Sequence, residues 1–380
     1  MLGLALEGGG AKGAFHVGAL KALFERGYSF DGVAGTSIGA LNGAIVAQGD
    51  FPVLEDIWRN ASFATLTGLD DEKFNRLLSR DLDRDLIRYM LRLARKTVKN
   101  RGLPMDKIRE FAATYIDEAR LRASPVDYCM VTVSISDDWT PLELFKEDIP
   151  EGMLTQYILT SAYFPVFNRP EVSGKSFMDG GMYNNCPVTP LIHRGYRNIV
   201  GIRTGSRMPS QKVLDMSVKV DYIDPSENLG TTLDFRKEKI AHNIKLGYYD
   251  ALRFTDKLIG MKYYIRPKTY AESINYLEHF DNECYEALSN ILDAQGTRRE
   301  LMARAARVAS EELGLASDVT AVEAVVAMFE YAAKLYGVEK FRIYGAEEFV
   351  SALAVRWTRE IPDVKYPKVY EIVKALIKGA

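Results

Sequence analysis

Ser37 stands in the run Gly35-Thr36-Ser37-Ile38-Gly39, the G-x-S-x-G pattern of a serine that attacks a carbonyl carbon. The apolar run Phe30–Ala34 predicts a strand before it, and residues Ile38–Gln48 predict a helix after it. A sharp strand-to-helix turn pushes the serine hydroxyl outward, and the two flanking glycines avoid the clash that a Cβ atom would cause. The helix start directs N–H groups and a partial positive charge toward whatever the serine attacks. The pattern predicts a nucleophile, although it also arises by chance.

A glycine-rich loop, Gly8-Gly9-Gly10-Ala11-Lys12-Gly13, lies between a predicted strand at Leu2–Leu6 and a predicted helix at Ala14–Arg26. Spare backbone N–H groups in such a loop can converge on an anion. We expect the N–H groups of Gly9 and Gly10 to form an oxyanion hole, with Lys12 adding positive charge or holding the loop.

Other interpretations of this loop are weaker. Gly8, Gly10 and Gly13 also satisfy the G-x-G-x-x-G pattern of an oxidoreductase that binds a dinucleotide. That pattern needs an acidic residue at the end of the second strand, whereas Asp31 comes at its start. The phosphate loop of nucleotide triphosphatases also fails, because Lys12 precedes the last glycine and no Ser or Thr follows. A tight turn without a chemical role stays open.

A serine hydroxyl needs a proton acceptor. Asp179-Gly180-Gly181 follows a predicted strand at Ser176–Met178, and a carboxylate at a strand end beside two glycines suits a base that a substrate must approach closely. Taken alone, Asp-Gly-Gly is more often a simple turn. An α/β-hydrolase would instead use a histidine, and His193 and His242 lie downstream; that fold, however, has several strands before its nucleophile.

Together, these three blocks resemble, in order, the signature blocks of the patatin-like phospholipase family. The resemblance implies that Ser37 is the nucleophile, that Asp179 is the only base, and that the loop Gly8–Gly13 forms the oxyanion hole. Ser161-Ala162-Tyr163-Phe164-Pro165 resembles a fourth block of the family, in which position 163 is usually small. The aromatic side chains of Tyr163 and Phe164 are therefore expected to narrow or bend the acyl pocket.

The resemblance covers about residues 1–268 and implies an α/β fold of three layers, with a mostly parallel central sheet flanked by helices. The first strand–helix–strand unit favours a parallel sheet independently. Residues 269–380 contain almost only helix-forming sequence, without a predicted strand or catalytic motif. We expect them to form a helical C-terminal region of unknown role.

Composition narrows the remaining classes. The chain has 380 residues, a formal net charge of −2 and three scattered cysteines, so we expect no nucleic-acid partner and no disulfide framework. Neither the cysteines nor the four histidines have metal-ligand spacing, and we expect no metal and no cofactor. With no long apolar run and no leader sequence, a cytoplasmic location is expected.

The sequence thus predicts a lipid acyl hydrolase, a phospholipase A or lysophospholipase-type esterase that forms an acyl-enzyme at Ser37. A catalytically weak lipid-binding or regulatory module is the alternative. Residues 82–101 form a predicted basic amphipathic helix, which favours either peripheral contact with a membrane surface, a lid, or ordinary core packing.

Overall fold

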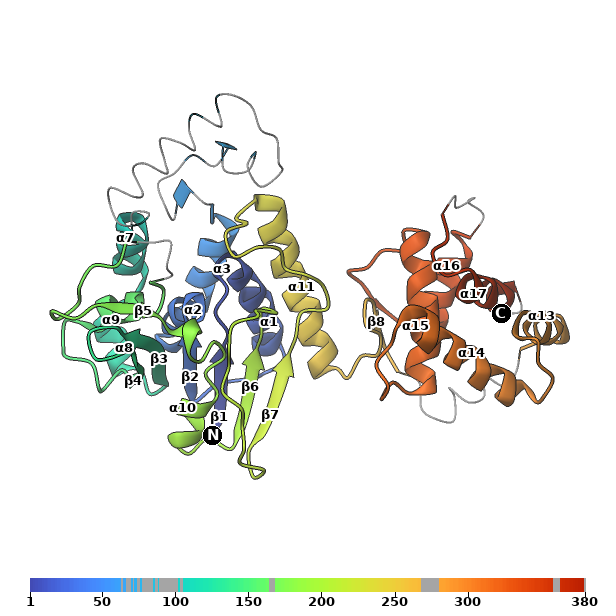
Figure 1. Ribbon diagram of the computed structural model, residues 1–380, viewed down its shortest axis with the longest axis horizontal. Coiled ribbons are helices and arrows are strands. Elements are labelled where there is room, and N and C mark those ends of the chain that lie inside the picture. The colour runs from blue at the N-terminus through green and yellow to red at the C-terminus, as the bar shows by residue number, and fades with distance from the viewer. Residues whose placement is uncertain are drawn as a thin grey trace. The chain divides into compact units, whose positions relative to one another are not determined.

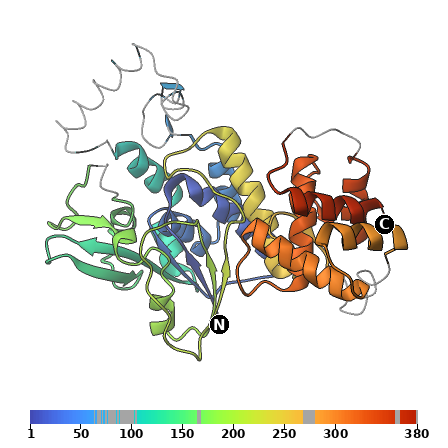
Figure 2. The same cartoon turned by 45° about the vertical axis from the view of Figure 1, so that its right-hand side comes forward.

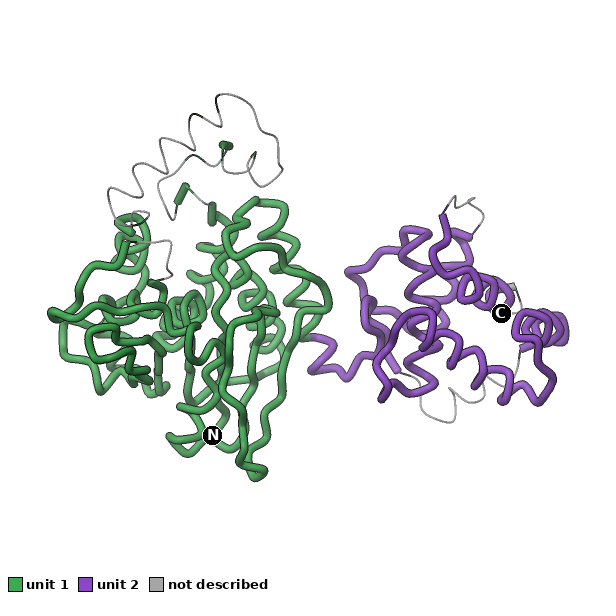
Figure 3. Tube along the Cα trace, viewed as in Figure 1, with its two compact units in different colours: residues 1–251 green, residues 252–380 purple. Residues whose placement is uncertain are grey.

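The protein forms two compact units, Met1–Ala251 and Leu252–Ala380 (Figure 3). The computed structural model describes residues 1–62, 105–163, 168–267, 280–357 and 363–378, with isolated positions between 64 and 102. The sequence had suggested a catalytic domain ending at residue 268. The observed division falls earlier, between Ala251 and Leu252, within the helix Lys237–Thr255 and near its C-terminal end.

The first unit is built on a seven-stranded sheet in the order β4-β3-β2-β1-β6-β7, with β5 pairing to β3 outside this path (Figure 1). Strands β2, β1, β6 and β7 and the β2–β3 pair run parallel, whereas β4 and β5 run antiparallel to β3. The expected mostly parallel sheet is therefore confirmed. The strands are β1 (Leu2–Leu6), β2 (Gly32–Thr36), β3 (Asp127–Ser134), β4 (Thr140–Phe145), β5 (Phe177–Asp179), β6 (Asn198–Ile202) and β7 (Lys219–Ile223).

Strand β2 begins at Gly32 and not at the predicted Phe30. Its first pair with β1 is Gly3 with Gly32, and β1 itself begins only at Leu2. Strand β1 therefore offers almost no residues with which Phe30 and Asp31 could pair. The shift places Ser37 directly after the strand, as the turn requires.

Helices flank the sheet and give the three expected layers (Figures 1 and 2). Helix α2 packs on one face against Leu6, Val33 and Tyr128, and α10 covers Ala5 and Ala34 on the other face. The described helices of this unit are η1 (Gly10–Gly13), α1 (Ala14–Glu25), α2 (Ile38–Ala47), α3 (Phe51–Arg59), α7 (Asp106–Tyr115), α8 (Glu118–Ala123), α9 (Leu154–Thr160), η2 (Gly180–Met182), α10 (Thr189–His193) and α11 (Lys237–Thr255).

Helices α1 and α11 cross at very short range. A Cβ atom on Gly18 would lie 1.8 Å from the carbonyl oxygen of Ile244, and one on Gly247 would lie 2.1 Å from that of Phe15. Only glycine at both positions permits this contact. The crossing holds α1, whose first residues continue from the glycine-rich loop.

The second unit is a helical cluster with its own core. Buried side chains of Leu288, Leu301, Met328, Phe349 and Ile372 meet there. Its described helices are α13 (Asn282–Leu292), α14 (Arg298–Leu313), α15 (Ala321–Leu335), α16 (Ala346–Ala354) and α17 (Pro367–Lys378).

The prediction of no strand after residue 270 is wrong, since β9 (Ile343–Tyr344) pairs in parallel with β8 (Tyr264–Ile265). The buried carboxylate of Glu330 in α15 accepts N–H groups from Met261, Lys262 and Tyr263. These contacts tie residues 261–265 to the helical unit and explain why the division precedes them. No described helix is long and apolar enough to cross a bilayer.

Candidate active site

Two strand ends meet along one edge of β3. Strand β2 pairs with β3 up to Thr36, which lies opposite Val131. Strand β5 then continues along β3 in the opposite direction, with Asp179 opposite Thr132. The C-terminal ends of β2 and β5 therefore face each other, and the structure brings Ser37 and Asp179 together across 142 positions of sequence.

Ser37 occupies the sharp turn between β2 and α2. Its φ of 57° and ψ of −124° are unusual for a residue with a side chain. A Cβ atom on Gly35 would lie 2.2 Å from the carbonyl oxygen of Gly39, and one on Gly39 would lie 2.2 Å from that of Leu6. Both glycines of the motif are thus required sterically.

The Ser37 hydroxyl donates a hydrogen bond to Asp179, with 2.7 Å between Oγ and Oδ2. The other carboxylate oxygen of Asp179 accepts the Gly181 N–H at 2.8 Å. The Asp179 side chain is buried, and burial raises the pKa of its carboxyl to about 6, against the two hydrogen bonds, which lower it. A carboxylate of this pKa accepts a proton near neutral pH more readily than an ordinary aspartate.

The glycine-rich loop leaves two N–H groups open beside Ser37. The Gly8 N–H bonds the carbonyl of Asn185 at 3.0 Å, and the Ala11 N–H bonds that of Thr232 at 2.8 Å. Between these anchors, the N–H groups of Gly9 and Gly10 have no acceptor among the described residues, and both glycines line the same cavity as Ser37. Their position suits donors to a developing oxyanion.

Other loop residues support this shape. Gly10 has a φ of 56°, and a Cβ atom there would lie 2.3 Å from the Thr232 carbonyl oxygen. Gly13 leaves room for the Trp58 ring, which would lie 2.9 Å from an added Cβ atom. Lys12 is partly buried; burial lowers the pKa of its ammonium, while the charge of Glu7 raises it.

A cavity of about 270 Å³ opens at the Ser37–Asp179 pair. Helices α2, α3 and α7 and the residues before α11 form its apolar part, and the glycine loop borders the cavity beside Ser37. Such a cavity accepts an apolar chain whose polar end reaches Ser37. The apolar lining comes mainly from Ile38, Leu41, Ile57, Trp58, Ile108, Phe111, Leu233 and Phe235.

Residues 4–192 match the family profile described as patatin-like phospholipase. This part of the chain belongs to the patatin-like phospholipase family. Over 218 residues, the chain is 30% identical to neuropathy target esterase sws of Drosophila melanogaster, a match that covers 54% of this chain and 13% of the fly protein. It is 30% identical over 213 residues to lysophospholipase NTE1 of Mycosarcoma maydis, covering 54% of this chain and 10% of the fungal one. The chain thus spans only a small part of these curated relatives.

Among solved structures, VipD from Legionella pneumophila aligns over 99% of this chain and 91% of its own, with 13% identity and a TM-score of 0.44.

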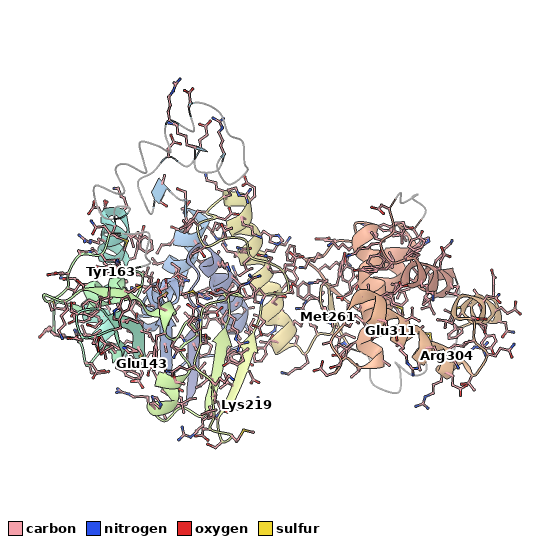
Figure 4. All side chains as sticks on the ribbon, viewed as in Figure 1. Glu143, Tyr163, Lys219, Met261, Arg304 and Glu311 are labelled. Carbon is pink, nitrogen blue, oxygen red and sulfur yellow. The ribbon has the colours of Figure 1, made fainter. Side chains whose placement is uncertain are left out.

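One of the two residues expected to line the pocket of this patatin-like domain, Tyr163, is placed differently. Tyr163, which is labelled in Figure 4, is buried. It does not border the cavity, whereas its neighbour Ala162 does. The Tyr163 hydroxyl interacts with the Arg109 guanidinium of α7, and burial raises the pKa of that hydroxyl. Tyr163 therefore supports the helix that forms the pocket wall. Phe164 lies outside the described residues. So do residues 82–101, which were predicted as a lid or a membrane-contacting helix, apart from isolated positions.

None of the three histidines of the first unit borders the cavity at Ser37 and Asp179. His16 is buried beside Asn42, and burial lowers the pKa of its imidazole to about 3. His193 is exposed near Glu143, and His242 bonds Glu227. Asp31 accepts the Leu2 N–H at the N-terminal ends of β1 and β2, whereas the glycine loop follows the C-terminal end of β1. A dinucleotide at the loop would therefore lack the acidic residue that it requires. Among the described residues, no group of three or more His, Cys, Asp and Glu side chains could hold a metal ion.

Sequence reasoning missed several residues of the site. Asn185 bonds Gly8 twice, since its own carbonyl accepts the Gly8 N–H and its Nδ2 donates to the Gly8 carbonyl at 3.4 Å. Trp58 lies in the cavity wall, held by a bond from its indole N–H to Asn42. The polar residues that follow Asp179-Gly180-Gly181 could have indicated Asn185. No feature of the sequence around Trp58 indicated that it borders the site.

Proposed function

We propose that the patatin-like domain hydrolyses carboxylic esters of lipids through an acyl-enzyme at Ser37. The observation that carries this proposal is the 2.7 Å bond between Ser37 and Asp179 in the wall of a mostly apolar cavity, beside two N–H groups without an acceptor among the described residues.

In the first half of the reaction, Ser37 Oγ attacks the ester carbonyl carbon while its proton passes to Asp179 Oδ2. The carbonyl oxygen becomes negative and accepts hydrogen bonds from Gly9 and Gly10, each worth about 3–4 kcal/mol in the transition state. The bond to the leaving alcohol then breaks, and the alcohol takes the proton from Asp179 as it departs.

In the second half, water enters where the alcohol was and gives a proton to Asp179 as its oxygen adds to the acyl carbon. The same N–H groups stabilise the second oxyanion. When the bond to Ser37 breaks, the proton returns to Oγ, and the fatty acid is released. One carboxylate thus acts as base and acid in turn.

The proposed substrate class follows from the cavity and from the family. Ile108 and Phe111 in α7 and Ile57 in α3 offer an apolar wall to an acyl chain. One matched relative is named lysophospholipase and another an esterase. We propose that lysophospholipids, phospholipids and related lipid esters are the substrates of this chain too.

We extend the proposal to peripheral contact with a lipid surface. Tyr115 both borders the cavity and is 37% exposed, and an amphipathic ring at an opening suits the boundary between water and lipid. Co-flotation with neutral and anionic vesicles tests this point. Absence of the protein from both vesicle fractions would contradict it.

The main test is hydrolysis of p-nitrophenyl esters and of a lysophospholipid by wild type, Ser37→Ala and Asp179→Asn. Both variants should lose activity by at least about a thousandfold while remaining folded by circular dichroism. Ser217→Ala and Asp137→Asn, at exposed positions away from the cavity, are the matched controls. An inactive wild type, or full activity of Asp179→Asn, would contradict the assignment and favour the lipid-binding alternative.

A further inference from the structure

We propose that the segment Ser161–Tyr163 positions both members of the Ser37–Asp179 pair, with the Ser161 hydroxyl as the residue that holds the nucleophile. This inference rests on the proposed function. Ser161 touches neither the substrate nor the reacting atoms, so it is a positioning residue.

The Ser161 hydroxyl joins the turn at Ser37 to the central sheet. Its Oγ accepts the backbone N–H of Ser37 at 2.8 Å and donates to the carbonyl of Val131 at 2.6 Å. The Ser37 N–H is a donor and the Val131 carbonyl is an acceptor, so the Ser161 hydroxyl proton must point toward Val131. Ser161 is fully buried, and water cannot replace either bond.

The same segment also holds the base. The Asp179 N–H donates to the carbonyl of Tyr163 at 3.1 Å. Between the two contacts, Ala162 borders the cavity. Three consecutive residues therefore touch the nucleophile, the cavity and the base.

The end of α9 fixes this segment in turn. The N–H groups of Ser161 and Ala162 bond the carbonyls of Ile158 and Leu159, in the last turn of the helix. Tyr163 adds its contact with Arg109 of α7. The segment is therefore anchored independently of Ser37 and Asp179, as a support must be.

Ser37 needs such support because its backbone lies in a sparsely populated region, which persists only where surrounding contacts impose it. Without the Ser161 hydroxyl, the Ser37 N–H and the Val131 carbonyl both lose a partner. The turn would relax, and Oγ would leave its position 2.7 Å from Asp179. The bond also occupies the Ser37 N–H, which leaves Gly9 and Gly10 as the loop donors to the oxyanion.

The experiment compares Ser161→Ala with Thr160→Val. Thr160 is also fully buried, but among the described residues its hydroxyl bonds only the Tyr157 carbonyl within α9, so each variant removes one buried hydroxyl. We measure kcat and KM for an ester that wild type hydrolyses, and the rate at which a fluorophosphonate labels Ser37. Labelling forms a bond from Oγ to phosphorus and releases fluoride, without requiring an acyl chain in the cavity.

Ser161→Ala should lower kcat and the labelling rate by about a hundredfold with KM within about threefold of wild type, because a small displacement of reacting atoms has this effect. Thr160→Val should keep both rates. Ser161→Thr retains the hydroxyl and should recover most of the loss. Equal rates for Ser161→Ala and wild type would overturn the inference, as would equal losses in Ser161→Ala and Thr160→Val.

If Ser161→Ala does not fold, Ser161→Thr and Ser161→Cys decide the matter, since the thiol is a weak donor and acceptor. The inference then requires Ser161→Thr to label faster than Ser161→Cys, and the reverse order overturns it. Wild type that neither hydrolyses esters nor reacts with the fluorophosphonate would instead refute the proposed function, which distinguishes the two failures.

Discussion

Thr36 and Asp179 lie opposite consecutive residues of one strand, Val131 and Thr132 of β3. Strands β2 and β5 run in opposite directions along β3, and their C-terminal ends meet at this point. The nucleophile follows Thr36 directly, so this register brings Ser37 and the Asp179 carboxylate to the same end of the two strands. The Thr36 hydroxyl adds a bond to the Asn184 carbonyl at 2.8 Å, which ties the end of β2 to the segment after Asp179.

The pH dependence of hydrolysis should report Asp179. Its carboxyl has a pKa raised to about 6 by burial, and it must be ionised to accept the Ser37 proton. We expect kcat/KM to be low at pH 4, to rise with a single ionisation centred near pH 6, and to level off above pH 7. A profile measured from pH 4 to 9 on a soluble ester checks this. A midpoint near pH 4, typical of an ordinary aspartate, would contradict it.

Asp179→Asn should stabilise the fold at pH 8 although it abolishes activity. The folded-state pKa of Asp179 lies above its unfolded value, so the folded protein holds this proton more tightly than the unfolded chain. The free energy of unfolding therefore falls as pH rises from about 4 to about 6, by up to about 3 kcal/mol, and stays lower above that range. Asparagine is neutral throughout and can still accept from Gly181 and donate to Ser37.

Urea unfolding at pH 8 and at pH 4 tests this sign. We expect Asp179→Asn to gain about 1–3 kcal/mol at pH 8 and almost nothing at pH 4. Asp137→Asn is the control of opposite sign, because bonds from Lys175 and Ser134 lower the pKa of its carboxyl. A loss of stability in Asp179→Asn at pH 8 would refute the argument.

Gly10→Ala should disable the oxyanion loop. The new Cβ atom would lie 2.3 Å from the Thr232 carbonyl oxygen, so the loop must move and the N–H groups of Gly9 and Gly10 lose their direction. We expect kcat to fall by about 10²–10³-fold. Gly49→Ala is the matched control, since Gly49 also has a positive φ, 88°, but open space around its Cβ position. It should lose about 1–2 kcal/mol of stability and keep its activity. Similar kcat values in the two variants would argue against the loop's role.

Filling the cavity should change the preferred chain length. Ile108 of α7 borders the cavity, and Ile108→Trp would occupy part of it. We expect kcat/KM for long-chain p-nitrophenyl esters to fall at least tenfold relative to the acetate or butyrate. Ala113→Trp changes an exposed position of the same helix that does not border the cavity, and it should leave the ratio unchanged. An unchanged ratio in Ile108→Trp would mean that the acyl chain binds elsewhere.

The sequence by itself determined the parts with local causes. The strand Leu2–Leu6, the helix after Ser37 and the glycines around the turn follow from apolar runs, helix periodicity and steric demand, which neighbouring residues decide. Ser37, Asp179 and the glycine loop could be chosen because each carries the required chemistry within a few positions of a strand end. The largely helical character predicted for residues 269–380 was equally local, apart from the short strand β9.

Only the tertiary structure decided which of these parts meet. Strand β5 has three residues, and its pairing with β3 beyond the end of β2 depends on contacts far apart in the chain. The buried Glu330 carboxylate accepts the N–H groups of residues 261–263 and so ties them to the second unit, a contact that neither part of the sequence indicates by itself. Tyr163 interacts with Arg109 and does not border the cavity, and the Ser161 hydroxyl bridges Ser37 and Val131. Such contacts form when packing brings distant groups together, and a buried polar group must then find its partner wherever the fold provides one.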